Sequence, residues 1–247
     1  MPKSHCSAAL LLMLLLLFSG AGSAFAGNLN VQFVNAGTWN HGGAFAMGGV
    51  YVGPYTISVN GRHMMAICDD AVNEVFNGET WKATSSTIAG GLGQAKWKGV
   101  TISAGVDGNP SKEVLSQVQE YQAIQYLGQL MIAELSNPTA VGEIQWAIWD
   151  LTAPGLINQS NGNETWGNVL PYLSAINTDI MAGINHDGGN GSHIVIYTPT
   201  SLGICGTNYC GTPQEYIRVT PEPASLVLLG TGLLAVAGSL WKKKSLN

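Results

Sequence analysis

The sequence predicts an α+β fold, in which a β-strand scaffold carries an inserted helical subdomain. Three observations lead to this class. Short apolar segments with partial alternation lie near both ends of residues 27–220, as expected for strands. Apolar residues recur at helical spacing in the middle of the chain. Only 10% of the 247 residues are charged and 32 are glycine, which favours an extracellular, strand- and loop-rich protein over a cytosolic enzyme.

Residues 1–26 are predicted to form a secretory signal peptide. A positively charged start precedes a leucine-rich apolar segment at 8–18, and Ala24-Phe25-Ala26 fits the small-x-small cleavage rule. The mature chain is then expected to begin at Gly27. Residues 27–220 follow as one exported globular domain.

The first part of this domain is predicted to be mainly strands. The expected strands are 28–38, 50–59 and 63–68. Gly53-Pro54 interrupts the second strand with a break or bulge. Asn60-Gly61 predicts a two-residue hairpin turn, because both positions tolerate positive φ. The return strand ends at Cys68, and residues 84–110 are expected to be loops with one strand near 100–103.

An antiparallel pair of helices is predicted for the middle of the domain. The first helix is expected over residues 111–135, with Ser111 as its cap, and Asn137-Pro138 ends it. The second helix is expected to start at the Thr139 cap and to run to Ala153. A linker of about four residues between two helices predicts a helical hairpin.

The rest of the domain is predicted to return to strands after one more helix. Residues 169–184 carry leucine and isoleucine in helical register. Residues 193–198 and 216–219 are expected to be the closing strands of the scaffold.

Gln145 is the residue of the second helix that most needs an explanation. At 3.6 residues per turn it shares a side with Val141 and Trp149. A buried amide without partners costs on the order of 1–3 kcal/mol. Either Gln145 hydrogen-bonds to nearby backbone, or its side-chain carbonyl has been captured by a cysteine thiol.

Residues Gln145-Trp-Ala-Ile-Trp149 resemble the Gln-x-Ala-Ile-Trp signature of bacterial surface thioester domains. The resemblance spans roughly residues 45–155. It implies that Gln145 is joined to Cys68 with loss of ammonia, giving an acyl group that an amine or hydroxyl of a surface partner can attack. Trp146 and Trp149 are expected to shield such a bond from water.

The C-terminal segment, residues 221–247, predicts membrane insertion and sorting. Pro221-Glu222-Pro223 precedes an uncharged apolar run of about 224–241 and the lysines of 242–244. Eighteen helical residues span about 27 Å, close to the thickness of a hydrocarbon core, and the lysines favour a cytoplasmic end.

This order of features resembles the PEP-CTERM sorting signal. The resemblance implies recognition by an exosortase, a membrane protease-transpeptidase that cuts near Pro221-Glu222-Pro223. It further implies secretion across the inner membrane and a transient anchor there. The cell surface or an extracellular polysaccharide matrix is then the final location.

The cysteines are expected to differ in state once Cys6 leaves with the signal peptide. Cys205 and Cys210 flank a short loop and predict a local disulfide in an oxidising compartment, with half of a metal site as the alternative. Cys68 is then left over. A thioester with Gln145 or a buried inert thiol would each account for it. No metal or cofactor is expected.

Charge and histidine placement limit the remaining functions. Residues 27–220 keep six of the ten Lys and Arg and 14 of the 15 Asp and Glu, a net charge of about −8, which argues against nucleic-acid partners.

A cysteine hydrolase would need His63, His186 or His193 as the base for Cys68, but no nucleophile motif surrounds the cysteine. We therefore expect no enzyme. A covalent adhesin and a non-reactive structural protein of an exopolysaccharide matrix remain as the two interpretations.

Overall fold

Most of the predicted exported domain is described by a computed structural model of the chain. The described residues are 27–37, 45–103, 112–154, 169, 171–173 and 194–219. The predicted signal peptide and the predicted sorting segment lie outside them. Among the described residues no helix is long and apolar enough to cross a membrane, and the expected span at 224–241 is not among them.

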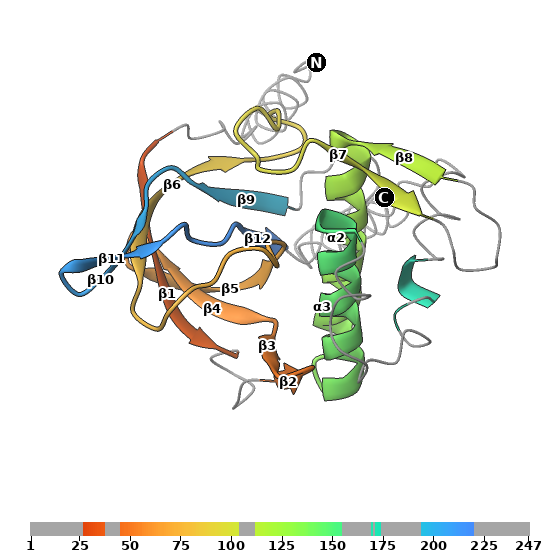
Figure 1. Cartoon of the computed structure of the whole chain (residues 1–247), viewed down its shortest axis with the longest axis horizontal. Coiled ribbons are helices and arrows are strands. Elements are labelled where there is room, and N and C mark those ends of the chain that lie inside the picture. Colours follow the sequence, from red (N-terminus) through yellow and green to blue (C-terminus); the bar gives the residue numbers. More distant parts are fainter. Residues whose placement is uncertain are drawn as a thin grey trace, which may run out of the picture.

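The elements follow the order strands, helices, strands (Figure 1). They are β1 (Leu29–Ala36), β2 (Phe45–Met47), β3 (Val50–Val52), β4 (Tyr55–Val59), β5 (Arg62–Cys68), β6 (Thr80–Ser86), β7 (Gly99–Ser103), β8 (Lys112–Ser116), α2 (Gln117–Ala133), α3 (Pro138–Thr152), β9 (Ile194–Pro199), β10 (Gly203–Cys205), β11 (Asn208–Gly211) and β12 (Tyr216–Val219). The predicted α+β class, with helices inserted between strands, agrees with this order.

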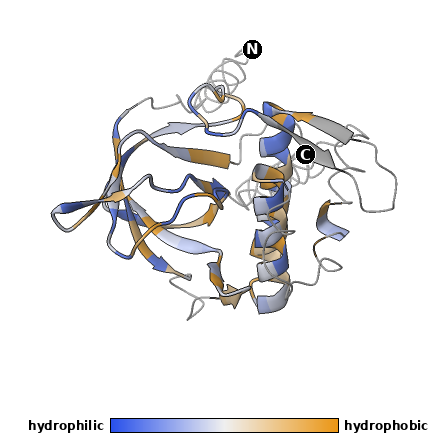
Figure 2. Ribbon diagram, viewed as in Figure 1, coloured by the Kyte–Doolittle hydropathy of each residue, from blue (hydrophilic) through white to orange (hydrophobic). Residues whose placement is uncertain are grey.

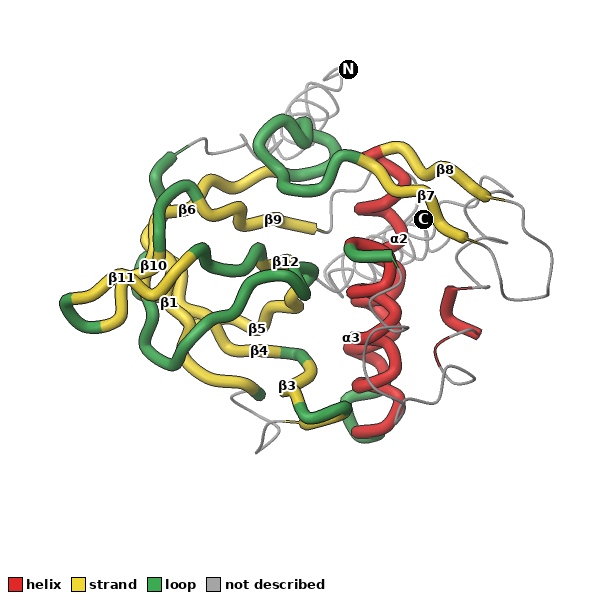
Figure 3. The backbone as a smooth tube through the Cα atoms, viewed as in Figure 1, coloured by secondary structure: helices red, strands yellow, loops and turns green. Residues whose placement is uncertain are grey.

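The main sheet closes on itself through β1. Its antiparallel order is β1-β4-β5-β12-β9-β6, and β1 pairs with β6 as well as with β4. Val31 lies opposite Val59 on one side and Trp81 on the other. The β10–β11 hairpin adds to the outer edge of β6 and projects away from the helices (Figure 3). Asn60 and Gly61 both have positive φ, as the predicted hairpin turn requires.

Two apolar clusters lie on opposite faces of the closed sheet. An aromatic cluster contains Phe33, Tyr55, Trp81 and Tyr216, and Cys68 belongs to it. The larger cluster joins the sheet to α2 and α3, and Ile67 belongs to it. Successive strand residues point to opposite faces, so β5 contributes to both cores. Figure 2 shows the apolar residues on β9 and along the helices that form the larger cluster.

The two helices form the predicted hairpin, but both begin elsewhere than predicted. The expected helix start at Ser111 is wrong, because residues 112–116 pair with β7 as strand β8. Ser116 caps α2 instead, in a capping box with Gln119. Thr139 is likewise not the cap of α3. Asn137 accepts from the Ala140 N–H, and Pro138 takes the first helical position.

Several short strands fall in segments that were predicted to be loops. Residues 84–86 belong to β6, which pairs with both β1 and β9. Strands β2, β10 and β11 were also not predicted. Of the third predicted helix, 169–184, only 169 and 171–173 are described, and they are helical.

Candidate functional site

Cys68 lies at the end of β5, in a turn that surrounds its sulfur with backbone. Its side chain is fully buried, and it is the free cysteine among the described residues. The Asp70 N–H donates to Sγ at 3.4 Å, and the thiol lies 3.4 Å from the Asp70 carbonyl oxygen. The predicted placement of Cys68 at a strand terminus is therefore confirmed.

Gln145 lies on α3 with its carboxamide against the β5 terminus. Its Nε2 donates to the Cys68 carbonyl oxygen at 2.6 Å, and its Oε1 accepts from the Gly53 N–H at 3.3 Å. Both contacts are buried, and they join residues 77 and 92 positions apart in the chain. A carbonyl can only accept and a backbone N–H can only donate. The two partners therefore fix which end of the amide is oxygen and which is nitrogen.

Gly53 allows this approach because it has no side chain. A Cβ at position 53 would lie 2.6 Å from Gln145 Oε1 and 3.1 Å from the Tyr55 ring. The Tyr55 hydroxyl donates to the Tyr51 carbonyl at 2.8 Å and spans the segment that contains Gly53. The interruption that the sequence predicted at Gly53-Pro54 thus separates β3 from β4 and brings the backbone to the glutamine.

The surroundings keep the Cys68 thiol protonated at rest. Burial raises the pKa of Cys68 well above its usual value, and the charges of Asp70 and Asp69 raise it further. The Asp70 backbone and the Trp149 side chain oppose this rise. A thiolate is consequently rare in the folded protein, and any reaction of this sulfur has to move the thiol proton as the new bond forms.

Asp70 organises the turn that follows Cys68. One carboxylate oxygen accepts from the Val72 and Asn73 N–H groups at 3.2 and 3.3 Å. The other forms a 2.5 Å ion pair with Lys96, whose ammonium also lies 4.6 Å from the centre of the Trp97 ring. These contacts fix the backbone that surrounds the Cys68 sulfur.

Two other acids, Asp69 and Glu215, form a fully buried pair close to Cys68. The Trp97 indole donates to Asp69 at 3.0 Å, while Tyr121 donates to Glu215 at 2.5 Å. Burial raises the pKa of Asp69 well above its usual value, and so do the charge of Glu215 and a hydrogen bond with its carboxyl group. The raised pKa favours the protonated, uncharged form of Asp69, which reduces the repulsion between the two buried carboxyl groups.

The two tryptophans of the signature pack together at the C-terminal half of α3. Trp146 and Trp149 are 6% and 5% exposed, and their rings meet edge to face with centroids 5.2 Å apart. Both belong to the core between the helices and the sheet. Both follow Gln145 on the same helix.

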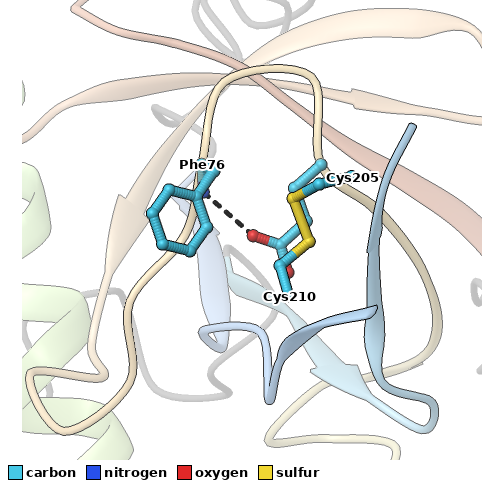
Figure 4. The surroundings of a disulfide bond; sticks show 4 residues. Phe76, Cys205 and Cys210 are labelled. Atoms are coloured by element: carbon cyan, nitrogen blue, oxygen red, sulfur yellow. Dashed lines mark hydrogen bonds between the residues drawn. A yellow bond between two sulfur atoms is a disulfide. The ribbon is translucent and has the colours of Figure 1, made fainter. Parts of the chain in front are cut away.

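Cys205 and Cys210 are joined in a disulfide at the outer hairpin, far in the fold from α3 (Figures 1 and 4). Glu79 lies beside the disulfide, accepts from the Phe76 N–H at 2.9 Å, and has a pKa raised by burial. The two sulfur atoms and a Glu79 oxygen lie within 4.8 Å of one another. Both sulfurs are used in the disulfide, so the group lacks the thiolates that a metal site would need.

Of the three histidines considered as the base of a hydrolase, the one that the structure describes does not lie at Cys68. His63 is exposed near the opposite end of β5, and its register partner is Ser58. His186 and His193 lie outside the described residues. The neighbours that do surround Cys68 and Gln145 include Gly53, Asp69 and Glu215, none of which was predicted as a site residue. The Gly53 N–H belongs to the backbone, so no side chain in the sequence points to it. Asp69 and Glu215 could have been noticed, because few residues of this domain are charged.

Comparison with known proteins identifies the C-terminal segment. Residues 219–243 match the family model of the PEP-CTERM protein-sorting motif. The chain carries a PEP-CTERM sorting motif at this end. The prediction from Pro221-Glu222-Pro223 and the following apolar run is thereby confirmed. The motif indicates an exported surface protein that is targeted to an exosortase and transiently anchored in the membrane before processing. No curated protein and no solved structure matches the chain.

Proposed function

We propose that this PEP-CTERM protein is a surface adhesin that attaches covalently to its partner through a thioester between Cys68 and Gln145. One observation carries the proposal. The Gln145 amide nitrogen donates to the Cys68 carbonyl at 2.6 Å across 77 residues, and both side chains are fully buried. The fold thus holds a carboxamide against the residue that bears a free thiol, which favours a reaction within the chain.

The proposed bond needs no outside reagent. Cys68 Sγ bonds to the Gln145 side-chain carbonyl carbon, the bond from that carbon to Nε2 breaks, and the thiol proton leaves with the nitrogen as ammonia. A partner amine or hydroxyl then attacks the same carbon. The carbon–sulfur bond breaks, and the partner's proton returns Cys68 to a thiol. The partner ends as an amide or ester of residue 145.

The burial of the site supports a long-lived thioester. Gln145 and Cys68 are both 0% exposed, and Trp146 and Trp149, which follow Gln145 on α3, are nearly buried in the larger core. Exclusion of water protects a reactive acyl group from hydrolysis until a partner arrives. Export places such a group outside the cell, where amines and hydroxyls of surfaces and polysaccharides are abundant.

The test is the mass of the full protein purified from the cells that export it. A thioester makes the peptide pair containing Cys68 and Gln145 lighter by about 17 Da, the mass of ammonia. Methylamine should then add about 31 Da at Gln145 and free one thiol that reacts with iodoacetamide. Gln145→Glu should abolish both changes. Gln119→Glu, a matched amide-to-acid change on α2, should leave both intact.

A second interpretation, a non-reactive structural component of a polysaccharide matrix, draws on both hydrogen bonds of Gln145 and on the raised pKa of the Cys68 thiol. Gln145 is satisfied at both ends by backbone, and Cys68 is buried with a raised pKa. An inert thiol and a structural glutamine account for these features. A wild-type mass without loss of ammonia, with no methylamine adduct, would support this interpretation and reject the adhesin.

A further inference from the structure

We propose that the Gly53 backbone N–H is a catalytic hydrogen-bond donor for the Gln145 acyl group, both when the thioester forms and when a partner attacks it. This inference rests on the proposed function. Gly53 contacts the one atom, Gln145 Oε1, on which negative charge develops when a nucleophile adds to the side-chain carbonyl. The N–H lies 3.3 Å from that oxygen in the resting amide.

The two ends of the carboxamide have different fates in the reaction. Nε2, held by the Cys68 carbonyl at 2.6 Å, leaves with ammonia when the thioester forms. The contact with Cys68 is therefore lost in the first step. Oε1 stays on the acyl carbon throughout, so the Gly53 N–H is the donor that can act in both steps.

The resting distance favours stabilisation of the transition state over the ground state. Donors that accelerate acyl transfer lie 2.7–3.1 Å from the position of the oxyanion. At 3.3 Å the contact with the neutral amide is long, and it can shorten as the carbonyl oxygen gains charge and moves away from the attacked plane. An interaction that strengthens in this way lowers the barrier instead of merely binding the amide.

The segment around Gly53 is held in place before any reaction. β3 pairs with β2, and Met47 of β2 lies against Gly142 of α3, one turn before Gln145. On the other side β4 is paired in the closed sheet, and Tyr55 donates to Tyr51 across the segment. A donor fixed from both sides requires little reorganisation during the reaction.

The absence of a side chain at position 53 fits the same role. A Cβ there would lie 2.6 Å from Oε1, so any larger residue would push the oxygen away from the N–H. Gly53 does not have the positive φ that reserves other positions for glycine. The close approach to Oε1 and the Tyr55 ring is therefore the reason for glycine here.

The sharpest test removes the N–H alone. Glycolic acid introduced at position 53 of the full chain by codon suppression replaces the Val52–Gly53 amide by an ester. Thioester formation and methylamine attack should both slow by about 100-fold, the lower end of the range for loss of one oxyanion donor. The infrared carbonyl band of the thioester should move to higher wavenumber, which a purely structural role would not cause. The same ester at Gly93 is the control.

A conventional variant gives an independent readout. Gly53→Ala should displace Oε1 and slow methylamine attack, whereas Gly93→Ala has nothing within 4 Å of its added carbon and should react as the wild type does. Equal rates and an unshifted band in the ester variant, with a thioester present, would overturn the role of Gly53 and leave the adhesin proposal intact. A wild-type protein without any thioester would overturn both.

Discussion

The Cys205–Cys210 disulfide and the Cys68–Gln145 contact, where we propose a thioester, differ in burial and in the length of chain between the two residues. Cys205 and Cys210 are five residues apart on an outer hairpin, half-buried, and form a disulfide. Cys68 and Gln145 are 77 residues apart and fully buried, and they meet only where α3 contacts the end of β5. A hairpin can bring the first pair together by itself, whereas the second pair requires the folded sheet and helices.

The same difference sets what each bond would contribute to stability. In the chain-entropy model, closing a loop of about five residues restricts the unfolded chain by about 2 kcal/mol, and closing one of 77 residues does so by about 4.5 kcal/mol. The long closure is the more stabilising, but it can form only after native packing has placed its two ends together. A thioester at the Cys68 site would therefore depend on the packing of the whole domain, whereas the disulfide does not.

Among the variants that separate the two sites, Gly128→Val on α2 is expected to have the largest effect on stability and on the reaction at Gln145. A Cβ at Gly128 would lie 2.6 Å from Val219 Cγ2 and 2.8 Å from Ile67 Cδ1, next to Cys68. Overpacking should separate α2 from β5 and cost about 3 kcal/mol. Urea denaturation should show this loss, and methylamine incorporation should fall, while the Cys205–Cys210 disulfide persists in peptide maps.

Gly93→Ala, outside the helices, is the control for that change. Its added carbon would have nothing within 4 Å, so stability and methylamine incorporation should both stay close to those of the wild type. A Gly128→Val protein that loses stability but keeps full methylamine incorporation would show that the reaction at Gln145 does not depend on how the helices pack against the sheet.

A smaller effect is expected when the disulfide is removed. Cys205→Ser with Cys210→Ser should lower the free energy of unfolding by at most about 2 kcal/mol, because the closed loop is short. The hairpin lies at the edge of β6, so we expect no change in the methylamine reaction at Gln145. A slower reaction in the double variant would contradict the independence of the two regions.

The sequence predicted the partners at the site better than it predicted how they are held. Gln145 on a helix and Cys68 at a strand end were both expected, and the structure places them in contact through backbone and amide. Gly53 was seen only as an interruption of a strand. Its N–H is placed by the pairing of β3 with β2 and of β4 with β1 and β5, and it meets α3 at Gln145, 92 residues further along the chain. No local pattern encodes that position.

The element boundaries failed where tertiary pairing overrides local preference. Residues 112–116 share apolar spacing with the helix that follows them, yet they pair with β7. Strands β10 and β11 are three and four residues long, too short for periodicity to reveal. The start of α3 was misplaced by two residues because Thr139 and Asn137 are both good caps, and the fixed φ of Pro138 at the first helical position favours Asn137.

The smallest effect is expected at the start of α3, and it tests which residue caps that helix. Asn137 Oδ1 accepts from the Ala140 N–H at 3.3 Å, and both Asn137 and Thr139 are exposed. Asn137→Ala should cost about 1 kcal/mol, and Thr139→Ala should stay within about 0.5 kcal/mol. Urea denaturation of the two variants measures the difference. Because Gln145 lies two turns further along and is held by Gly53 and Cys68, methylamine incorporation should not change in either variant. A larger loss of stability for Thr139→Ala than for Asn137→Ala would support Thr139 as the cap, as the sequence predicted. Slower methylamine incorporation in Asn137→Ala would show that fraying of the first turn of α3 disturbs the Gln145 side chain.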